Sequence, residues 1–343
     1  MLAERKKQHL DIVLAGNSVS GHIGTSFEAV RFEHVALPEI DMSAIDLSTE
    51  FLGKRITMPF LVSSMTGGAE KAQRINHNIA IACEAIGIPF AVGSQRIALD
   101  TDADWGMNLE LRRLAPSVPI LANIGVAQLN TGYGIDQARR AVEMIDADAL
   151  IIHLNPLQEA VQPEGDRNWK GLTEKIGKLA GALPVPVVAK EVGSAISPSV
   201  AGRLAALGVR IIDVAGAGGT SWAAVEALRA RTPAEAAIAS AFSDWGQPTA
   251  FAIAALREAQ PDLFIIGSGG VRTGVDAAKA IRLGADLVGQ AASVLQAATV
   301  SPEDLAEHFG IMSGQLRVAC FCTGSSNLAE LRVAKLEAVP FRG

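Results

Sequence analysis

Residues 149–159, ALIIHLNPLQE, show how this chain is built. Four apolar residues predict a buried strand of the kind that parallel sheets contain. Pro156 ends that strand, because proline has no amide hydrogen for the strand ladder. Polar side chains follow at once, at positions His153, Asn155, Gln158 and Glu159. Because α/β barrels carry their chemistry at the carboxyl ends of their strands, this stretch predicts a site there.

Seven further apolar runs alternate with amphipathic segments. Together with the first they predict strands over residues 58–63, 88–93, 118–124, 149–154, 185–192, 209–214, 263–266 and 286–289. Most begin roughly 25–35 residues apart, which is the length of one strand–helix unit. The long gap after residue 214 predicts an inserted loop around residues 242–246. The pattern predicts an α/β protein with a (β/α)8 TIM barrel.

One barrel domain is expected over residues 56–343, after an irregular extension over residues 1–55. A short charged helix is expected over residues 2–14, and we expect the extension to close over the substrate as a lid. An open doubly wound sheet is the competing fold. Its glycine fingerprint is absent, because residues 216–219 and 267–270 lack the third glycine at the required spacing.

Composition narrows the class of protein. The 343 residues are 49% apolar and carry a formal charge of −6, which argues against binding nucleic acid or an anionic membrane. Three cysteines form no disulfide framework and predict a reducing, cytoplasmic location. Cys320 and Cys322 match no metal motif and read as ordinary helix residues. No signal peptide or membrane-spanning stretch is visible.

Several predicted strands end in glycine or in polar residues. Glycine-rich loops at 267–274 and 289–292 follow strands seven and eight, where barrels bind phosphate, so they predict a phosphorylated ligand such as a cofactor. Lys190, at the end of strand five, could form a Schiff base, face an anionic cofactor or pair with Glu191. A lone histidine such as His153 is more often structural than catalytic.

The set of motifs resembles the flavin-dependent, type II isopentenyl diphosphate isomerases from Arg5 to about Glu330. The matching stretches are RKxxH at 5–9, MTGG at 65–68, GSQR at 93–96, HLNxxQE at 153–159, KEVG at 190–193, GGTSW at 218–222 and DWG at 244–246. The resemblance implies an FMN-binding barrel, Mg²⁺, NADPH as reductant, and a homo-oligomer, either a tetramer or an octamer.

The resemblance also implies site residues. FMN would contact Met65, Thr66, Gly67, Ser94, Asn123, Lys190, Thr220, Gly269, Gly270, Val271, Arg272, Ala291 and Ala292. The substrate would contact Arg5, Lys6, His9, Ser94, Gln95, Arg96, Asn155 and Gln158. Glu159 would bind Mg²⁺, while Gln158, His153 and Lys190 would be catalytic. The family often has a serine where this chain has Ala215, so one hydrogen bond to FMN is expected to be missing.

The implied activity interconverts isopentenyl and dimethylallyl diphosphate by a 1,3-proton shift with reduced FMN, in isoprenoid biosynthesis. Arg5, Lys6, His9, Arg96 and a Glu159-bound Mg²⁺ would meet the charge of this small-molecule diphosphate. Reduced FMN would donate and accept protons, with Lys190 stabilising its negative charge. Gln158 would either assist proton movement or orient the alkene.

Three other functions are compatible with a flavin-binding barrel. An FMN-dependent 2-hydroxy-acid oxidase or dehydrogenase needs a late histidine base, yet no histidine lies between His153 and His308; a nucleotide dehydrogenase needs a cysteine after strand six, and none is there. A non-catalytic flavin-binding barrel would not need Arg5, Lys6 or Gln158.

Overall fold

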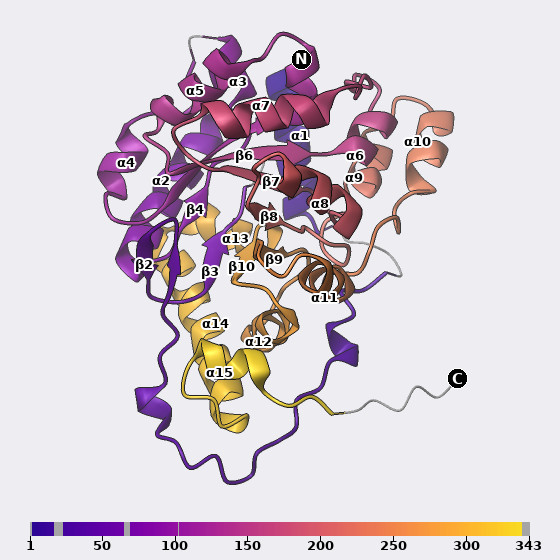
Figure 1. Ribbon diagram of the computed structural model, residues 1–343. Helices are drawn as coiled ribbons and strands as arrows, with labels where there is room; N and C mark the ends of the chain where they lie inside the picture. The colour runs from indigo at the N-terminus through magenta and orange to yellow at the C-terminus, as the bar shows by residue number, and fades with distance from the viewer. Residues whose placement is uncertain (1, 17–22, 65–68, 102, 338–343) are drawn as a thin grey trace.

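A closed barrel of eight parallel strands forms the centre of the computed structural model, which describes residues 2–16, 23–64, 69–101 and 103–337 (Figure 1). The strands are β3 (Phe60–Val62), β4 (Phe90–Ala91), β5 (Ile120–Gly125), β6 (Ala149–Leu154), β7 (Val187–Glu191), β8 (Ile211–Asp213), β9 (Phe264–Ser268) and β10 (Leu287–Gln290). β10 pairs with both β9 and β3, which closes the ring. The predicted (β/α)8 barrel and all eight strand positions are confirmed.

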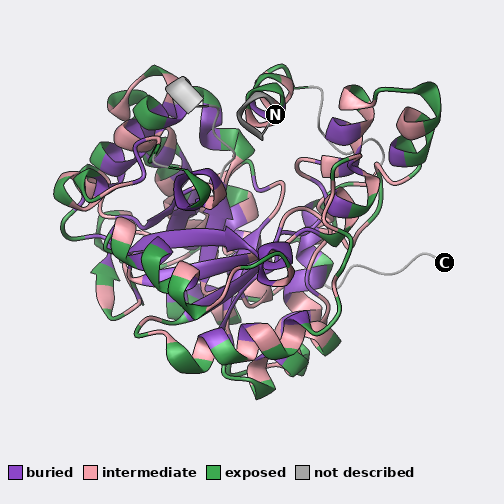
Figure 2. Ribbon diagram, turned by 90° about the horizontal axis from the view of Figure 1, so that it is seen from above, coloured by how far each residue is buried: buried purple, intermediate pink, exposed green. Residues whose placement is uncertain are grey.

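Helices surround the barrel, with their exposed faces outward and the buried strands at the centre (Figure 2). They are α2 (Ala69–Ile86), α3 (Arg96–Asp100), α4 (Glu110–Leu114), η3 (Val126–Asn130), α5 (Ile135–Met144), α6 (Pro156–Val161), α7 (Leu172–Ala182), α8 (Pro198–Ala206), α9 (Trp222–Arg229), α10 (Pro233–Ser240), α11 (Thr249–Ala259), α12 (Gly274–Leu283), α13 (Ala292–Val300), α14 (Pro302–Cys322) and α15 (Leu328–Val333).

Local sequence sets the helix ends. In α12, for example, Thr273 and Asp276 form a reciprocal capping box, and Gly284 ends the helix with a φ of 119°. Between β8 and β9 the expected loop is wrong in one respect. Residues 242–246 do form a turn, but α9 and α10 precede it, so the insertion is mainly helical.

Apolar side chains fill the barrel interior, and a hairpin closes its lower end. Leu61, Leu121, Ile151, Val188, Ile211, Ile266 and Leu287 form one buried cluster. The hairpin strands β1 (Thr49–Phe51) and β2 (Lys54–Ile56) add Phe51 and Ile56 to that cluster. The amino-terminal end of the barrel is therefore sealed by hydrophobic packing.

A polar layer lies on top of this apolar interior. Side chains two residues apart in a strand point to the same face, so each interior position is followed two residues later by another interior position. Here those positions are Ser63, Asn123, His153, Lys190, Asp213, Ser268 and Gly289. Because of this two-residue period, a layer of mainly polar side chains lies above the apolar interior at the carboxyl end of the barrel. We call this layer the polar floor of the cavity.

The amino-terminal extension divides into two parts. Helix α1 (Leu2–Leu14), predicted from the sequence, brings Arg5, His9 and Val13 to the carboxyl end of the barrel. From residue 23 the chain instead runs around the outside toward α14 and α15, through η1 (Phe27–Ala29) and η2 (Met42–Ala44) (Figure 1). There Glu33 N donates to Lys335 O at 3.0 Å. Within the described part of the extension, α1 is the segment whose side chains line the cavity at this end of the barrel.

Candidate active site

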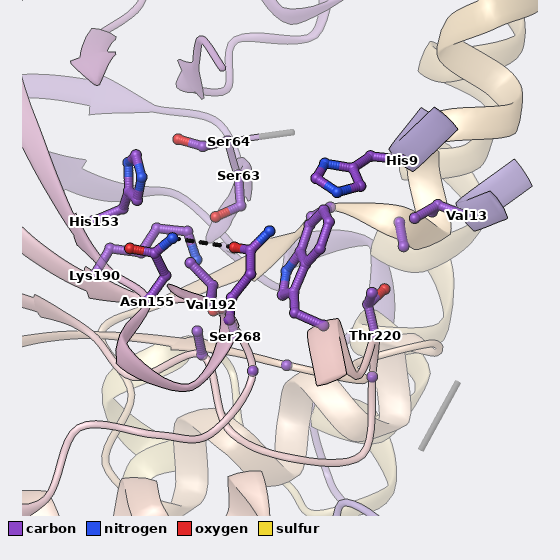
Figure 3. Close-up of a pocket in the computed structure, with 18 of the residues that line it drawn as sticks. His9, Val13, Ser63, Ser64, His153, Asn155, Lys190, Val192, Thr220 and Ser268 are labelled. Carbon is purple, nitrogen blue, oxygen red and sulfur yellow. Dashed lines mark hydrogen bonds between the residues drawn. The ribbon is translucent and has the colours of Figure 1, made fainter. Parts of the chain in front are cut away.

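A cavity of about 440 Å³ opens at the carboxyl ends of the strands, beneath α1. This volume lies in the range of small-molecule sites. Figure 3 shows Lys190 and His153 on one side and His9 and Val13 of α1 on the other. The cavity brings together these predicted site residues: Arg5, Lys6, His9, Ser94, Arg96, Asn123, His153, Asn155, Gln158, Glu159, Lys190, Thr220, Gly269, Gly270, Val271, Arg272, Ala291 and Ala292.

Gln95 is the exception among the described candidates. Its side chain is buried and points away from the cavity, since Nε2 donates to Ala141 O at 2.9 Å and Oε1 accepts from Asn123 N at 2.9 Å. The expected substrate contact is therefore wrong, because both ends of the amide hold the loop after β4 in place. Met65, Thr66 and Gly67 lie outside the described residues.

Lys190 forms an ion pair on the floor of the cavity. Its Nζ lies 3.3 Å from Asp213 Oδ2 and donates to Glu191 O at 2.8 Å. Pairing with the Glu191 carboxylate, one of the expected alternatives, is wrong. That carboxylate accepts the backbone N–H groups of residues 192–194 through Oε2 and so anchors the loop after β7.

His153 is held neutral on the same floor. Burial, followed by the charges of Lys190 and Lys6, lowers the pKa of His153 to about 4. Asn123 donates through Nδ2 to Val92 O, so its Oδ1 accepts from His153 Nδ1 at 2.8 Å. The proton therefore sits on Nδ1, and Nε2 keeps a lone pair that can accept a hydrogen bond.

The first turn of α6 presents the amide of Gln158 in a fixed orientation. Asn155 Nδ2 donates to Gln158 Oε1 at 3.1 Å, and Gln158 Nε2 donates to Glu226 Oε1 at 3.3 Å. Asn155 Nδ2 also donates to Glu159 Oε1 at 3.0 Å. Pro156 begins this helix at a position where its missing N–H costs nothing, so the strand passes directly into the helix.

Positive charge gathers at the mouth of the cavity. Lys6 Nζ donates to Ser94 O at 2.9 Å, and Arg96 pairs with Asp166 at 3.1 Å. Burial, followed by the charges of Arg5 and Arg96, lowers the pKa of Lys6 to about 8. Burial also lowers the pKa of Arg5. These cations repel one another, so an anion bound among them would be stabilised.

Glu226 of α9 joins α1 to the barrel. It is 1% exposed, accepts from His9 Nε2 at 2.8 Å and pairs with Arg229. Burial opposes ionisation of Glu226, yet its pKa is lowered because His9, Arg229 and Gln158 surround it. His9 also packs edge-on against Trp222, with ring centroids 5.1 Å apart. One carboxylate thus contacts both α1 and the amide of Gln158.

Glycines bring two backbone loops against the cavity. Gly269 and Gly270 have φ values of 108° and 68°, and a Cβ on Gly219 would lie 2.7 Å from Gly270 N. Such close approach of backbone amides suits a phosphate group, so these loops fit the phosphate of FMN. Ala215, at φ 39°, also lines the cavity, and its methyl group offers no hydrogen bond.

A divalent cation would find oxygen ligands beside Gln158. Asn155 Oδ1 is buried and has no hydrogen-bond partner among the described residues, and Glu159 is next to it at 7% exposure. Within the described ranges, no group of three or more histidine, cysteine or acidic side chains is placed to hold a metal. These residues fit a Mg²⁺ ion that has one or two protein ligands and completes its coordination with oxygens from phosphate and water.

Residues of this site whose roles were not predicted from the sequence include Ser63, Asp213, Ser268 and Glu226. The first three could have been found, since each lies two residues beyond an interior apolar residue of a predicted strand. Glu226 could not, because its contact with His9 spans 217 positions and depends on how α1 docks. No local pattern in the sequence records such a contact.

Comparison with known proteins agrees with this geometry. The profile of FMN-dependent dehydrogenases matches residues 20–101 and 139–338. The chain is 59% identical over 335 residues to the isopentenyl-diphosphate delta-isomerase of Stutzerimonas stutzeri, covering 98% of this chain and 97% of that protein. It is 48% identical to the isopentenyl-diphosphate delta-isomerase of Synechocystis, covering 95% and 93%.

Among solved structures, the chain resembles a lactate oxidase of Pediococcus acidilactici, with a TM-score of 0.68, 17% identity and coverage of 98% and 94%. It also resembles a mandelate oxidase, with a TM-score of 0.66, 16% identity and coverage of 98% of each chain. These likenesses concern the fold alone. No described helix is long and apolar enough to cross a membrane. With relatives near 50–60% identity over almost its whole length, the chain belongs to the FMN-dependent, type II isopentenyl-diphosphate delta-isomerases.

Proposed function

We propose that the protein interconverts isopentenyl and dimethylallyl diphosphate by a 1,3-proton shift, using reduced FMN and Mg²⁺, as a step of isoprenoid biosynthesis. The observation that carries the proposal is that one cavity combines a cluster of cations with an oriented amide and a polar floor. Arg5, Lys6 and Arg96 line the same cavity as Lys190 and His153, and the Gln158 amide in its wall is held by Asn155 and Glu226.

The diphosphate head would bind at the cationic mouth. Lys6 and Arg5 carry lowered pKa values because they are buried together, so a diphosphate would relieve their repulsion. Glu159 and the unpaired Asn155 Oδ1 would supply protein ligands to Mg²⁺, with phosphate oxygens completing the octahedron. His153 is neutral, so it would contribute no charge to the site. Its Nε2 lone pair would act as a hydrogen-bond acceptor.

The hydrocarbon part would then extend toward the floor. FMN, when bound and reduced, supplies the acid and base for the proton shift, with no net oxidation. Lys190 would hold negative charge on the ring, and Gln158 would orient the double bond. An amide is a poor acid, so orientation is the role that its two hydrogen bonds support.

Four further features of the protein are inferred from the family resemblance. We infer NADPH as the reductant, a cytoplasmic location, a homo-oligomeric assembly, and a lid function for the amino-terminal extension. The contacts of α1 with Ser94 and Glu226 support the lid, since they join it to both the mouth and Gln158.

A turnover assay tests the proposal. The purified protein should be yellow and should convert isopentenyl diphosphate only after dithionite reduces the flavin and Mg²⁺ is present. The isopentenyl alcohol, which lacks the diphosphate, serves as the matched control and should not react. Equal rates with oxidised and reduced flavin would remove the acid–base role of the reduced ring, and oxidation of lactate would favour the oxidase alternative.

A further inference from the structure

Asp213 is the most deeply buried acid beneath the cavity. Its exposure is 0%, and it does not itself line the cavity wall. Oδ2 lies 3.3 Å from Lys190 Nζ and accepts from Ser63 Oγ at 3.1 Å, while Oδ1 accepts from Ser268 Oγ. Three strands besides its own therefore contribute a partner to one carboxylate.

The shape of the barrel makes room for this cluster. A Cβ on Gly289 would lie 2.9 Å from Ser268 Cβ and 3.5 Å from Ser63 Oγ. Glycine at this point of β10 lets the two hydroxyl groups converge on Asp213. A buried carboxylate is costly unless it is paired and hydrogen-bonded, and here both conditions are met.

The cluster also fixes where the Lys190 ammonium points. Among the described residues, Asp213 Oδ2 and Glu191 O take two of its three N–H donors. The third remains available to a group in the cavity, whose wall includes Lys190. Without Asp213 the flexible lysine stem would have no charged partner to hold it at this position.

We propose that Asp213 is a positioning residue and internal counter-ion. It holds Lys190 against the bound flavin and limits how strongly the floor stabilises negative charge on the reduced ring. This inference rests on the proposed function, because it requires FMN on this floor. Lys190 and Asp213 together carry no net charge, so the floor is balanced when the flavin is oxidised.

The two charges therefore act in opposite directions on the flavin. Removing the carboxylate leaves an uncompensated ammonium, which favours the anionic reduced ring. Removing the ammonium leaves a buried carboxylate, which disfavours it. A residue with a purely structural role would change stability and flavin affinity without this opposition of sign.

The test is the midpoint potential of the FMN holoprotein, titrated with dithionite against a reference dye. Asp213→Asn removes the negative charge, but the asparagine oxygen can still accept from Lys190 Nζ and keep the ammonium in place. This variant should therefore raise the potential by at least the equivalent of a tenfold change in the reduction equilibrium, about 30 mV for two electrons. Lys190→Met should lower it, and the double variant should fall between. Asp148→Asn is the matched control, because Asp148 also pairs with cations, Lys54 and Arg112, but at the opposite end of the barrel.

An unchanged or lowered potential in Asp213→Asn overturns the inference. If that variant does not fold, Ser268→Ala keeps both charges, removes one hydroxyl donor from Asp213 and should lower the potential by strengthening the carboxylate's hold on Lys190. No shift there also overturns it. A wild-type protein that binds no FMN would instead contradict the proposed function, so the two failures are distinguishable.

Discussion

At the scale of single residues, the site depends on side chains whose orientation is fixed from both ends. Gln158 lies between Asn155 and Glu226, and His153 is set by Asn123. We expect the orientation of these side chains to affect the catalytic rate rather than substrate binding, because their contacts with the substrate would be made fully only in the transition state. Charge at the mouth contributes to binding instead. Substitutions should therefore separate kcat from KM.

Gln158→Ala should lower kcat by about 100-fold and leave FMN bound, because the proposed function assigns the amide to the reacting carbons and the glycine loops to the flavin phosphate. Steady-state kinetics with pre-reduced FMN and saturating Mg²⁺ measure this. Gln296→Ala is the control, since Gln296 is exposed on α13. A wild-type kcat in Gln158→Ala would place the reacting carbons elsewhere.

Lys6 should give binding a pH dependence. Its pKa is about 8 in the ligand-free site, and the diphosphate needs the protonated form. Values of kcat/KM should thus be flat below pH 8 and fall by about tenfold per unit well above it, because the free enzyme then loses the charge. Lys6→Arg keeps its charge at these pH values and should remove the decline. A decline that persists in Lys6→Arg would assign the titration to another group.

At the scale of elements, the barrel strands could be predicted from the sequence, whereas the hairpin and some of the helices around them could not. Apolar runs that end in glycine or polar residues marked all eight barrel strands. The hairpin at residues 49–56 was not predicted, because Phe51 and Ile56 become apolar anchors only against the barrel base. The helix α10, which precedes the loop expected around residues 242–246, was not predicted, since its alanine-rich sequence has no apolar stripe to identify it. Gln95 was misplaced for a related reason: α5, which its amide contacts, is distant in sequence.

Helix α1, the proposed lid, is held to the barrel by side-chain contacts rather than by a strand ladder. These contacts include those of Lys6, Gln8 and His9, at 2.9, 3.1 and 2.8 Å. Amide hydrogen exchange of residues 2–14 should therefore be faster than that of β6. Diphosphate substrate with Mg²⁺, at 100 times its Kd, should slow it by about 100-fold if opening releases the ligand.

Exchange in α12 serves as the internal control for this measurement, because that helix packs away from the lid against α14. Its protection should be the same with and without substrate. Equal protection of α1 in the two conditions would mean that α1 is a permanent wall rather than a lid.

At the scale of the whole molecule, the two ends of the barrel differ in structure. The amino-terminal end is sealed by apolar packing, and the carboxyl end carries the polar floor. Phe51→Ala should cost about 3–5 kcal/mol of unfolding free energy, because it opens a cavity at the sealed end where Phe51 is 2% exposed. Urea denaturation measures the loss, and Phe251→Ala, at 60% exposure, is the matched control. Similar costs for the two variants would show that the hairpin does not seal the barrel.

The closure of β10 onto β3 also bears on how the protein is made. Ser63 N donates to Gln290 O at 2.7 Å. Strand β3, the first of the barrel, therefore pairs with β10, which lies more than two hundred residues later in the chain. On the ribosome, β3 keeps one edge unpaired until β10 has emerged, and such an edge can pair with another nascent chain. Flavin capture is consequently a late step in the folding of the barrel, since Ser63 and Gly289 reach the same floor only after β10 has been synthesised.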